Sequence, residues 1–336
     1  MFANVLVTGG AGYVGSVLVP RLLAAGHCVR VLDLYAFGRE SLAGARGQAG
    51  LEEVEGDVRD NDAVSRTLEG IDAVIHLACI SNDPSCELDP ELTHDINYRA
   101  FEPLVRLSRE RGVKRFIFAS SASVYGISEA AQVTEEHPLK PVSLYNRYKA
   151  MCEEVLFRYQ APEFTTVAVR PATICGTSPR QRLDLTVNIL TTHAVERGEI
   201  TVFGGAQQRP NLHIDDMVDL YELLLQSPSA GVAGQAFNAS YRNHTVAEVA
   251  DLVKQIVEGE MPERRAITIT TTPSNDPRSY HVCTDKIRTR LGYTPRRQIE
   301  EAVRDLVGAL RSGRLPAALT DSRYYNVQRM REIQLR

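Results

Sequence analysis

Residues 5–15 read VLVTGGAGYVG, and this stretch decides the fold. The apolar run at 5–7 predicts a short strand, and the apolar and polar pattern over 13–25 predicts a helix directly after the glycine-rich turn. A pyrophosphate binds to bare backbone N–H groups at a helix N-terminus, where a Cβ atom would block its approach. The stretch therefore predicts a dinucleotide-binding turn. Its candidate contacts are Gly9, Gly12, Tyr13 and Val14.

An acidic residue ends the next predicted strand. In VLDLY, Asp33 closes the apolar run that starts at residue 29, about 20 positions after the glycine turn. A carboxylate at this place accepts hydrogen bonds from the adenosine ribose and would repel a 2′-phosphate. The spacing therefore predicts NAD rather than NADP as the cofactor. Asp57 and Val58 follow a further strand, and they are candidates for holding the adenine.

Short apolar runs and helical patterns alternate through the first half of the chain. Strands are expected at 74–77, 116–118 and 166–169, with helical patterns over 89–111 and 143–160. Strands that alternate with helices imply a parallel sheet covered on both faces. We therefore predict an α/β protein with a doubly wound parallel (Rossmann) sheet.

The pattern loosens from about residue 172, where long loops rich in Arg begin. This change predicts a smaller, mixed C-terminal lobe that binds the substrate. The expected boundaries are residues 1–171 for the NAD-binding domain and 172–336 for the substrate lobe, which is partly interleaved with the first. The tail after Pro316 is polar, and we expect it to dock on the body or on a partner.

Composition narrows the classes of function. The chain has 336 residues and a net charge of −4, which argues against a broad nucleic-acid or membrane surface. Its six cysteines form no C-x-x-C pair, so we expect no metal site and a reducing compartment. The chain starts directly on a strand, without a secretory signal, and no apolar run reaches the roughly 20 residues of a membrane span. These features predict a cytoplasmic enzyme.

Tyr145 and Lys149 stand four residues apart in SLYNRYK. At this spacing two side chains share one face of a helix. A nearby ammonium stabilises a phenolate, so we expect a Tyr145 pKa lowered toward neutrality and a usable general base. Such a pair is common by chance on a solvated helix face. A catalytic role for this pair is favoured here because residues 120–123 lie at the end of a strand, where doubly wound sheets bind their ligands.

These motifs together resemble the extended short-chain dehydrogenase/reductase family, in particular its nucleotide-sugar epimerases and dehydratases. The resemblance covers most of the chain. The matching segments, in the family's order, are TGGAGYVG, Asp33, GDVRD, HLAC, SSASVYG, YNRYK, VRPATICG and RPNLHIDD. One departure is Tyr148, which stands where the family often has a small residue or Ser, and it puts the local packing in question.

The resemblance implies a role for individual residues and a homodimer formed through the helices at 89–111 and 143–160. Ser121 would be the catalytic hydroxyl, Tyr145 the base, and Lys149 the residue that tunes the base and holds the nicotinamide ribose. Arg180 and Arg182 lie in a nearby loop. The other implied cofactor contacts are Leu77, Ala78, Asn97, Ser120 and Pro171. The implied contacts to a nucleotide-diphosphate sugar are Ser81, Ser121, Ser123, Asn188, Val202, Arg209 and Arg278.

The two residues after Ser121 separate the reactions of this family. Its dehydratases usually carry acids there and its decarboxylases a Glu in the second place, whereas this chain has Ala122 and Ser123. Hydride transfer without elimination is therefore expected, as in a UDP-glucose 4-epimerase. The same triad also serves an NAD(P)H-dependent 4-ketoreductase, which remains an alternative. A non-catalytic dinucleotide sensor on this fold is a third reading.

Overall fold

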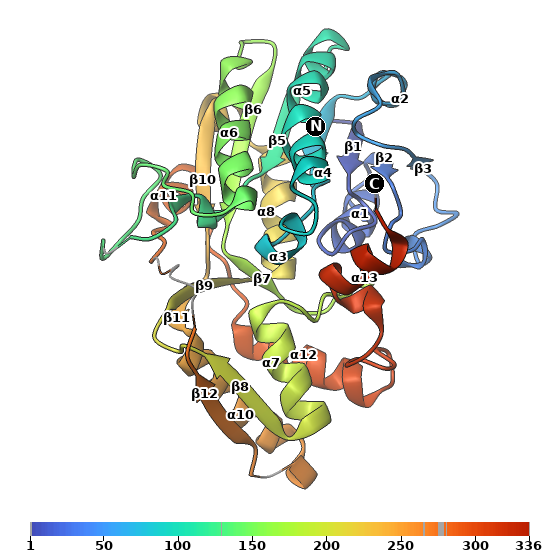
Figure 1. Ribbon diagram of the computed structural model, residues 1–336. Coiled ribbons are helices and arrows are strands. Elements are labelled where there is room, and N and C mark those ends of the chain that lie inside the picture. Colours follow the sequence, from blue (N-terminus) through green and yellow to red (C-terminus); the bar gives the residue numbers. More distant parts are fainter. Residues whose placement is uncertain (1, 129, 265, 275–278, 280, 336) are drawn as a thin grey trace.

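The computed structural model describes residues 2–335 apart from 129, 265, 275–278 and 280. Within them, seven parallel strands form a central sheet in the order β10-β6-β5-β4-β1-β2-β3 (Figure 1). This arrangement confirms the predicted doubly wound α/β fold. The strands are β1 (Asn4–Thr8), β2 (Cys28–Asp33), β3 (Leu51–Glu55), β4 (Ala73–His76), β5 (Arg115–Ala119), β6 (Thr165–Pro171) and β10 (Gln235–Ala239).

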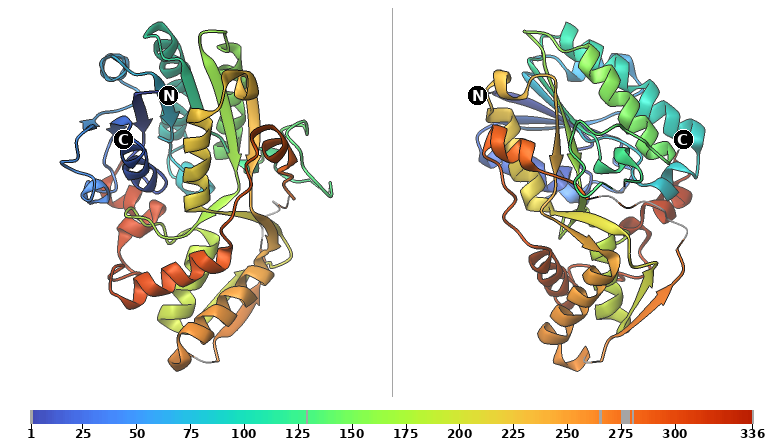
Figure 2. Two further views of the ribbon diagram at one scale, coloured as in Figure 1. Left: turned by 180° about the vertical axis from the view of Figure 1, so that it is seen from behind. Right: turned by 90° about the vertical axis from the view of Figure 1, so that its left-hand side faces the viewer.

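Helices cover both faces of this sheet, which is why its inner strands are almost continuously apolar. Residues Val5, Leu6 and Val7 of β1 are fully buried between the two layers. Figure 2 shows the layers on opposite sides of the sheet. One layer contains α1 (Gly15–Ala24) and α8 (Ile214–Gln226), and the other contains α2 (Asn61–Thr67), α5 (Phe101–Glu110) and α6 (Leu144–Arg158).

The C-terminal lobe, which is expected to bind the substrate and is called the substrate lobe below, packs beyond the carboxyl ends of the strands (Figure 1). Its core is a separate apolar cluster that includes Val187, Val253 and Leu306, one from each of its main helices. These helices are α7 (Thr186–Arg197), α10 (Val246–Glu260) and α12 (Ile299–Arg311). Its small sheets comprise β7 (Thr173–Cys175), β9 (Gln208–His213) and β11 (Arg242–Thr245), and β8 (Glu199–Phe203) with β12 (Thr268–Thr272).

The chain crosses between the two parts more than once. Strand β10 and helix α8 belong to the central sheet and its covering layer, although both follow residue 171. The C-terminal helix α13 (Asn326–Ile333) also returns to the Rossmann part, where it packs against the short helix α3 (Asp83–Cys86). The other short helices are α4 (Pro90–His94), α9 (Ser229–Val232) and α11 (Asp285–Leu291).

No helix in the described part of the chain is long and apolar enough to cross a bilayer. Among the same residues, no group of three or more His, Cys, Asp and Glu side chains is placed to hold a metal ion.

Candidate active site

A cavity of about 580 Å³ lies at the carboxyl ends of the central strands, between the sheet and the substrate lobe. Loops after β1, β2, β4, β5 and β6 contribute to its wall. Most of the residues proposed from the sequence line this cavity. They are Gly9, Gly12, Tyr13, Val14, Asp33, Val58, Leu77, Ala78, Ser81, Ser120, Ser121, Ser123, Tyr145, Lys149, Pro171 and Arg209.

The glycine-rich turn, which we call the glycine cradle, has no room for side chains at Gly9 and Gly15. A Cβ atom on Gly9 would lie 2.6 Å from the backbone nitrogen of Ala78, and Gly9 has φ +73°. A Cβ atom on Gly15 would lie 2.5 Å from the carbonyl oxygen of Gly9. The turn therefore brings bare backbone to the N-terminus of α1, and this geometry fits the diphosphate of a dinucleotide.

Asp33 stands at the end of β2 on the wall of the same cavity. Its carboxylate accepts hydrogen bonds from the backbone N–H groups of Ala11 (2.9 Å) and Tyr35 (2.7 Å). Burial raises the pKa of Asp33 above its usual range, although these two N–H groups oppose the shift. Asp33 thus anchors the glycine turn to the loop after β2, in addition to the ribose contact expected of it.

Replacing Asp33 with alanine is expected to weaken NAD binding by at least about 10-fold, because hydrogen bonds to a charged group contribute about 1.5–3 kcal/mol. Affinity for a nucleotide sugar should change by less than about 2-fold, since Asp33 lies on the cofactor side. Calorimetric titration of both ligands checks this. An equal loss for the two ligands would contradict the ribose role.

Tyr145 and Lys149 lie on the first turns of α6 and share the face that lines the cavity. The Lys149 Nζ atom is 5.7 Å from the centre of the Tyr145 ring. It donates a hydrogen bond to the carbonyl oxygen of Ala119 (2.6 Å) at the end of β5, and the side chain is buried. The phenol, the ammonium and the glycine turn therefore border one cavity.

The expected lowering of the Tyr145 pKa is wrong for the protein as this structure describes it. Burial raises the pKa of the phenol well above its ordinary value, and the nearby Cys79 and Cys86 thiols add to the rise. The Lys149 ammonium lies beside the ring but hydrogen-bonds to a carbonyl, and Arg182 provides the main opposing influence. Desolvation of a phenolate outweighs one nearby cation here.

Ser121 is tied to α6 through its neighbours. Its Oγ atom lies 2.7 Å from Oγ of Ser123, and Ser123 in turn donates a hydrogen bond to the side chain of Asn146 on α6. Ser123 lines the cavity, whereas Ala122 is buried in a small cluster with Val124. Of the two positions after Ser121, the second is therefore the one that borders the cavity.

A buried ion pair supports the neighbouring Ser120. Arg170 of β6 and Glu153 of α6 form a salt bridge of 2.6 Å, with side-chain exposures of only 6% and 2%. Ser120 donates a hydrogen bond to Glu153, and Arg170 donates one to the hydroxyl of Tyr125 (2.7 Å). This network fixes the end of β5 against the helix that carries Tyr145 and Lys149.

Tyr148 packs without disturbing this helix. Its ring stacks on Tyr98 at 6.0 Å and meets His94 edge-on at 5.5 Å. The unusual residue before Lys149 is thus accommodated by an aromatic group on the neighbouring helices.

Some proposed contacts lie outside the cavity lining. Asp57 pairs with Arg59 at 2.6 Å, and Val202 is buried in the core of the substrate lobe. Asn188 is also buried, and it accepts a hydrogen bond from the Gly176 N–H (3.1 Å) and donates one to the Arg182 carbonyl (2.7 Å). Asn188 therefore shapes the loop that borders the cavity. Arg278 lies outside the described residues.

Asn97 also acts on the cavity through another residue. The expected single helix over 89–111 is interrupted by a π-helical turn, η2 (Asp95–Arg99), that carries it. The Asn97 side chain accepts a hydrogen bond from the Ile80 N–H and donates one to the Ile80 carbonyl, both at 2.8 Å. It thereby holds the loop that lines the cavity after β4. Single π-helical turns often occur at functional sites.

Residues far along the chain complete the wall. Arg180, Arg182, Asp184 and Asn326 all line the cavity, and the two Arg side chains are almost fully buried. The loop of Arg180 and Arg182 is recognisable by its charge. Asn326 and Asp184 have no sequence signal, because their place depends on how the C-terminal segment folds back.

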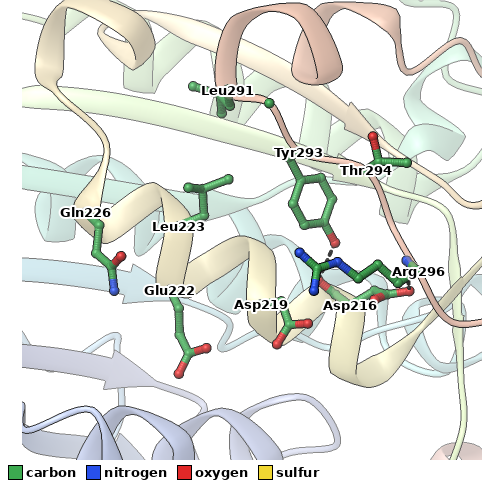
Figure 3. A pocket seen from close by; sticks show the side chains of 10 residues that line it. Asp216, Asp219, Glu222, Leu223, Gln226, Leu291, Tyr293, Thr294 and Arg296 are labelled. Carbon is green, nitrogen blue, oxygen red and sulfur yellow. Dashed lines mark hydrogen bonds between the residues drawn. The ribbon is translucent and has the colours of Figure 1, made fainter.

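A second hollow, between α8 and the segment at 291–296, is explained by its ion pairs (Figure 3). Asp219 of α8 pairs with Arg21 at 2.6 Å and with Arg297 at 2.8 Å. The Tyr293 hydroxyl points to α8 and donates a hydrogen bond to the Asp216 carbonyl (2.5 Å). These contacts join α1, α8 and the segment before α12, so the acids have a structural role.

Comparisons with known proteins agree with this geometry. The model of the NAD dependent epimerase/dehydratase family matches residues 5–240. A UDP-glucose 4-epimerase from Lactobacillus helveticus is 28% identical over 314 residues, covering 88% of this chain and 93% of that protein.

Two solved structures share the fold closely. One is a UDP-glucose 4-epimerase with UDP-glucose from Thermotoga maritima (TM-score 0.80, 26% identity, 92% of this chain and 99% of that one). The other is DesIV, a dTDP-glucose 4,6-dehydratase from Streptomyces venezuelae, with NAD bound (TM-score 0.82, 25% identity, 95% and 99%).

Proposed function

Because the chain belongs to the NAD-dependent epimerase/dehydratase family, we propose that it is a nucleotide-sugar 4-epimerase that acts by transient oxidation at carbon 4. NAD is its cofactor, in keeping with its family and with the glycine cradle beside Asp33. The observation that carries the proposal is that Ser121, Tyr145 and Lys149 border the same cavity as this cradle.

The reaction needs a proton to leave and return at one sugar hydroxyl. We assign to Tyr145 the role of taking that proton and giving it back, as a general base and then a general acid. When bound, NAD supplies the hydride acceptor and donor and a positive charge near the phenol. Such a charge favours phenolate, which the buried Tyr145 otherwise disfavours.

The neighbouring groups orient the sugar and the base. Ser123 donates its own proton to Asn146, so the Ser121 hydroxyl donates to Ser123 in this structure. To donate a hydrogen bond to the reacting oxygen, the Ser121 hydroxyl turns away from Ser123 when the sugar binds. Lys149 keeps two of its three protons free of the Ala119 carbonyl, and we assign these to the nicotinamide ribose and the phenol. Arg209, which also lines the cavity, is assigned to the diphosphate of the nucleotide sugar.

The residues after Ser121 favour epimerisation over elimination. Ser123 borders the cavity at the second of the two positions where dehydratases carry acids, and a hydroxyl cannot protonate a leaving group as a carboxylic acid does. A homodimer formed through the segments at 89–111 and 143–160 is part of the same proposal.

The test is turnover of UDP-, dTDP- and GDP-sugars by the protein loaded with NAD. We expect interconversion of the two carbon-4 epimers without net consumption of NAD(H). Chromatography of the sugars measures this interconversion. Stoichiometric consumption of NADH or NADPH would identify a ketoreductase. Loss of water from the sugar, detected by mass spectrometry, would identify a dehydratase. NAD binding without any turnover would favour the sensor.

A further inference from the structure

The C-terminal segment crosses the dinucleotide groove. At one end, Arg329 of α13 donates a hydrogen bond to the carbonyl oxygen of Ala36, in the loop after β2 (3.0 Å). At the other, the Asn326 side chain donates one to Oγ of Ser81, in the loop after β4 (3.0 Å). Because β1 lies between β2 and β4 in the sheet, residues 326–335 span the groove directly beyond the glycine turn. We name this segment the C-terminal clasp.

Apolar contacts fix the clasp in place. Met330 is 6% exposed and belongs to the core cluster that also contains Val58 and Ile80, and the partly buried Leu335 packs against this cluster. Met330, Leu335 and Asn326 all face the cavity. The clasp is therefore part of the cavity wall, and a dinucleotide in the groove would lie beneath it.

Arg180 is the charged residue that the clasp holds. Its Nη2 atom donates a hydrogen bond to Oδ1 of Asn326 (2.5 Å), and its guanidinium lies 3.8 Å from the centre of the Phe37 ring. The side chain is 5% exposed, and among the described residues no carboxylate lies within ion-pair distance of it. Its Nε atom also lacks a hydrogen-bond partner there. Burial lowers the pKa of the Arg180 guanidinium to about 9.

A buried cation without an ionic partner is unfavourable until an anion arrives. The backbone N–H of Arg180 donates to Oγ of Ser16, on the first turn of α1, so Arg180 stands beside the helix N-terminus where a dinucleotide diphosphate binds. Arg182, by contrast, has an ionic partner, because Asp184 pairs with it at 2.9 Å. The diphosphate is the anionic part of NAD.

We propose that Arg180 is a ligand of the NAD diphosphate and that the C-terminal clasp, through Asn326, positions Arg180 and retains the cofactor. This inference goes beyond the proposed function, because it holds for any reaction that the bound NAD serves. It gives the last residues of the chain a role in the cofactor site, more than 300 positions after the glycine turn.

The first experiment compares Arg180→Gln with wild type and with Arg331→Gln, which changes an exposed Arg of the same clasp. We expect Arg180→Gln to weaken NAD and ADP-ribose by about 10- to 100-fold and to leave adenosine binding unchanged, since a charge-assisted hydrogen bond contributes about 1.5–3 kcal/mol. Arg331→Gln should bind all of these ligands like wild type.

Thermal unfolding separates this role from a structural one. Without NAD, Arg180→Gln should have the same Tm as wild type or a higher one, because the substitution removes a buried charge that Asp184 and Asp33 favour only from beyond ion-pair distance. Its rise in Tm on adding NAD should be smaller than that of wild type. A lower Tm without NAD, together with wild-type affinity for ADP-ribose, would overturn the assignment.

The second experiment measures retention. Asn326→Ala and Arg329→Ala are expected to release NADH at least about 5-fold faster than wild type when it is chased with excess NAD, as followed by NADH fluorescence, whereas Arg331→Gln releases it at the wild-type rate. Arg329→Ala serves if Asn326→Ala fails to fold. If both folded variants release NADH at the wild-type rate, the proposed role of the clasp in retaining the cofactor is overturned. A wild-type preference for NADP, lost in Arg180→Gln, would instead assign Arg180 to a 2′-phosphate and overturn the diphosphate role.

Discussion

Replacing Tyr145 with phenylalanine is expected to lower kcat by about 10²- to 10⁴-fold, the usual contribution of a positioned general acid–base group. The substitution removes only the hydroxyl, so Lys149 keeps its bond to Ala119 and NAD affinity should stay within about 2-fold of wild type. Steady-state kinetics with the substrate found in the sugar panel, together with NAD titration, check both statements.

The matched control is Tyr148→Phe. Tyr148 lies on the same helix and stacks on Tyr98, outside the cavity lining, so its hydroxyl should be dispensable. A Tyr145→Phe enzyme with near wild-type kcat would remove Tyr145 from the reaction. A loss of the same size in Tyr148→Phe would point to a disturbed helix instead.

The pH profile of wild type follows from the same residue. Burial raises the pKa of Tyr145, so the phenolate fraction grows as pH rises. We therefore expect kcat/KM to increase from neutral to alkaline pH, and this slope should be absent in the residual activity of Tyr145→Phe.

Replacing Arg170 with methionine is expected to lower the free energy of unfolding by about 3–5 kcal/mol. The change leaves Glu153 buried without its cation, at 2% side-chain exposure. The change also removes the hydrogen-bond donor to the Tyr125 hydroxyl, and it loosens Glu153, the carboxylate that accepts a hydrogen bond from Ser120. Denaturant unfolding followed by circular dichroism gives the stability, and kcat of the folded fraction should fall because Ser120 adjoins Ser121.

Two controls separate the buried charge from loss of packing. The double variant Arg170→Met with Glu153→Gln should recover much of the stability, since both charges are then absent. Arg106→Met, which breaks an exposed pair with Glu110, should reduce stability by no more than about 1 kcal/mol. A loss below about 1 kcal/mol in Arg170→Met would show that this network does not support the site.

Local motifs made much of the site predictable. The glycine turn and Asp33 depend on backbone and charge requirements that act over about 20 residues, and Tyr145 and Lys149 on the spacing of one helical turn. These residues duly line one cavity. The family resemblance implied that Asn97 and Asn188 contact ligands, and in the structure both side chains hydrogen-bond to nearby backbone groups. A residue's type and position along a helix do not reveal which loop will fold against it.

The sequence by itself predicted the fold class, the NAD cofactor and the pairing of Tyr145 with Lys149 on α6. Each of these follows from patterns among residues close in sequence. Tertiary structure decided the direction of the Tyr145 pKa shift, since desolvation depends on everything packed around the phenol. It also decided the wall formed by Arg180 and the clasp, where Asn326 meets Ser81 across 245 positions. Such contacts arise only when separate apolar faces are buried together, and no local pattern encodes them.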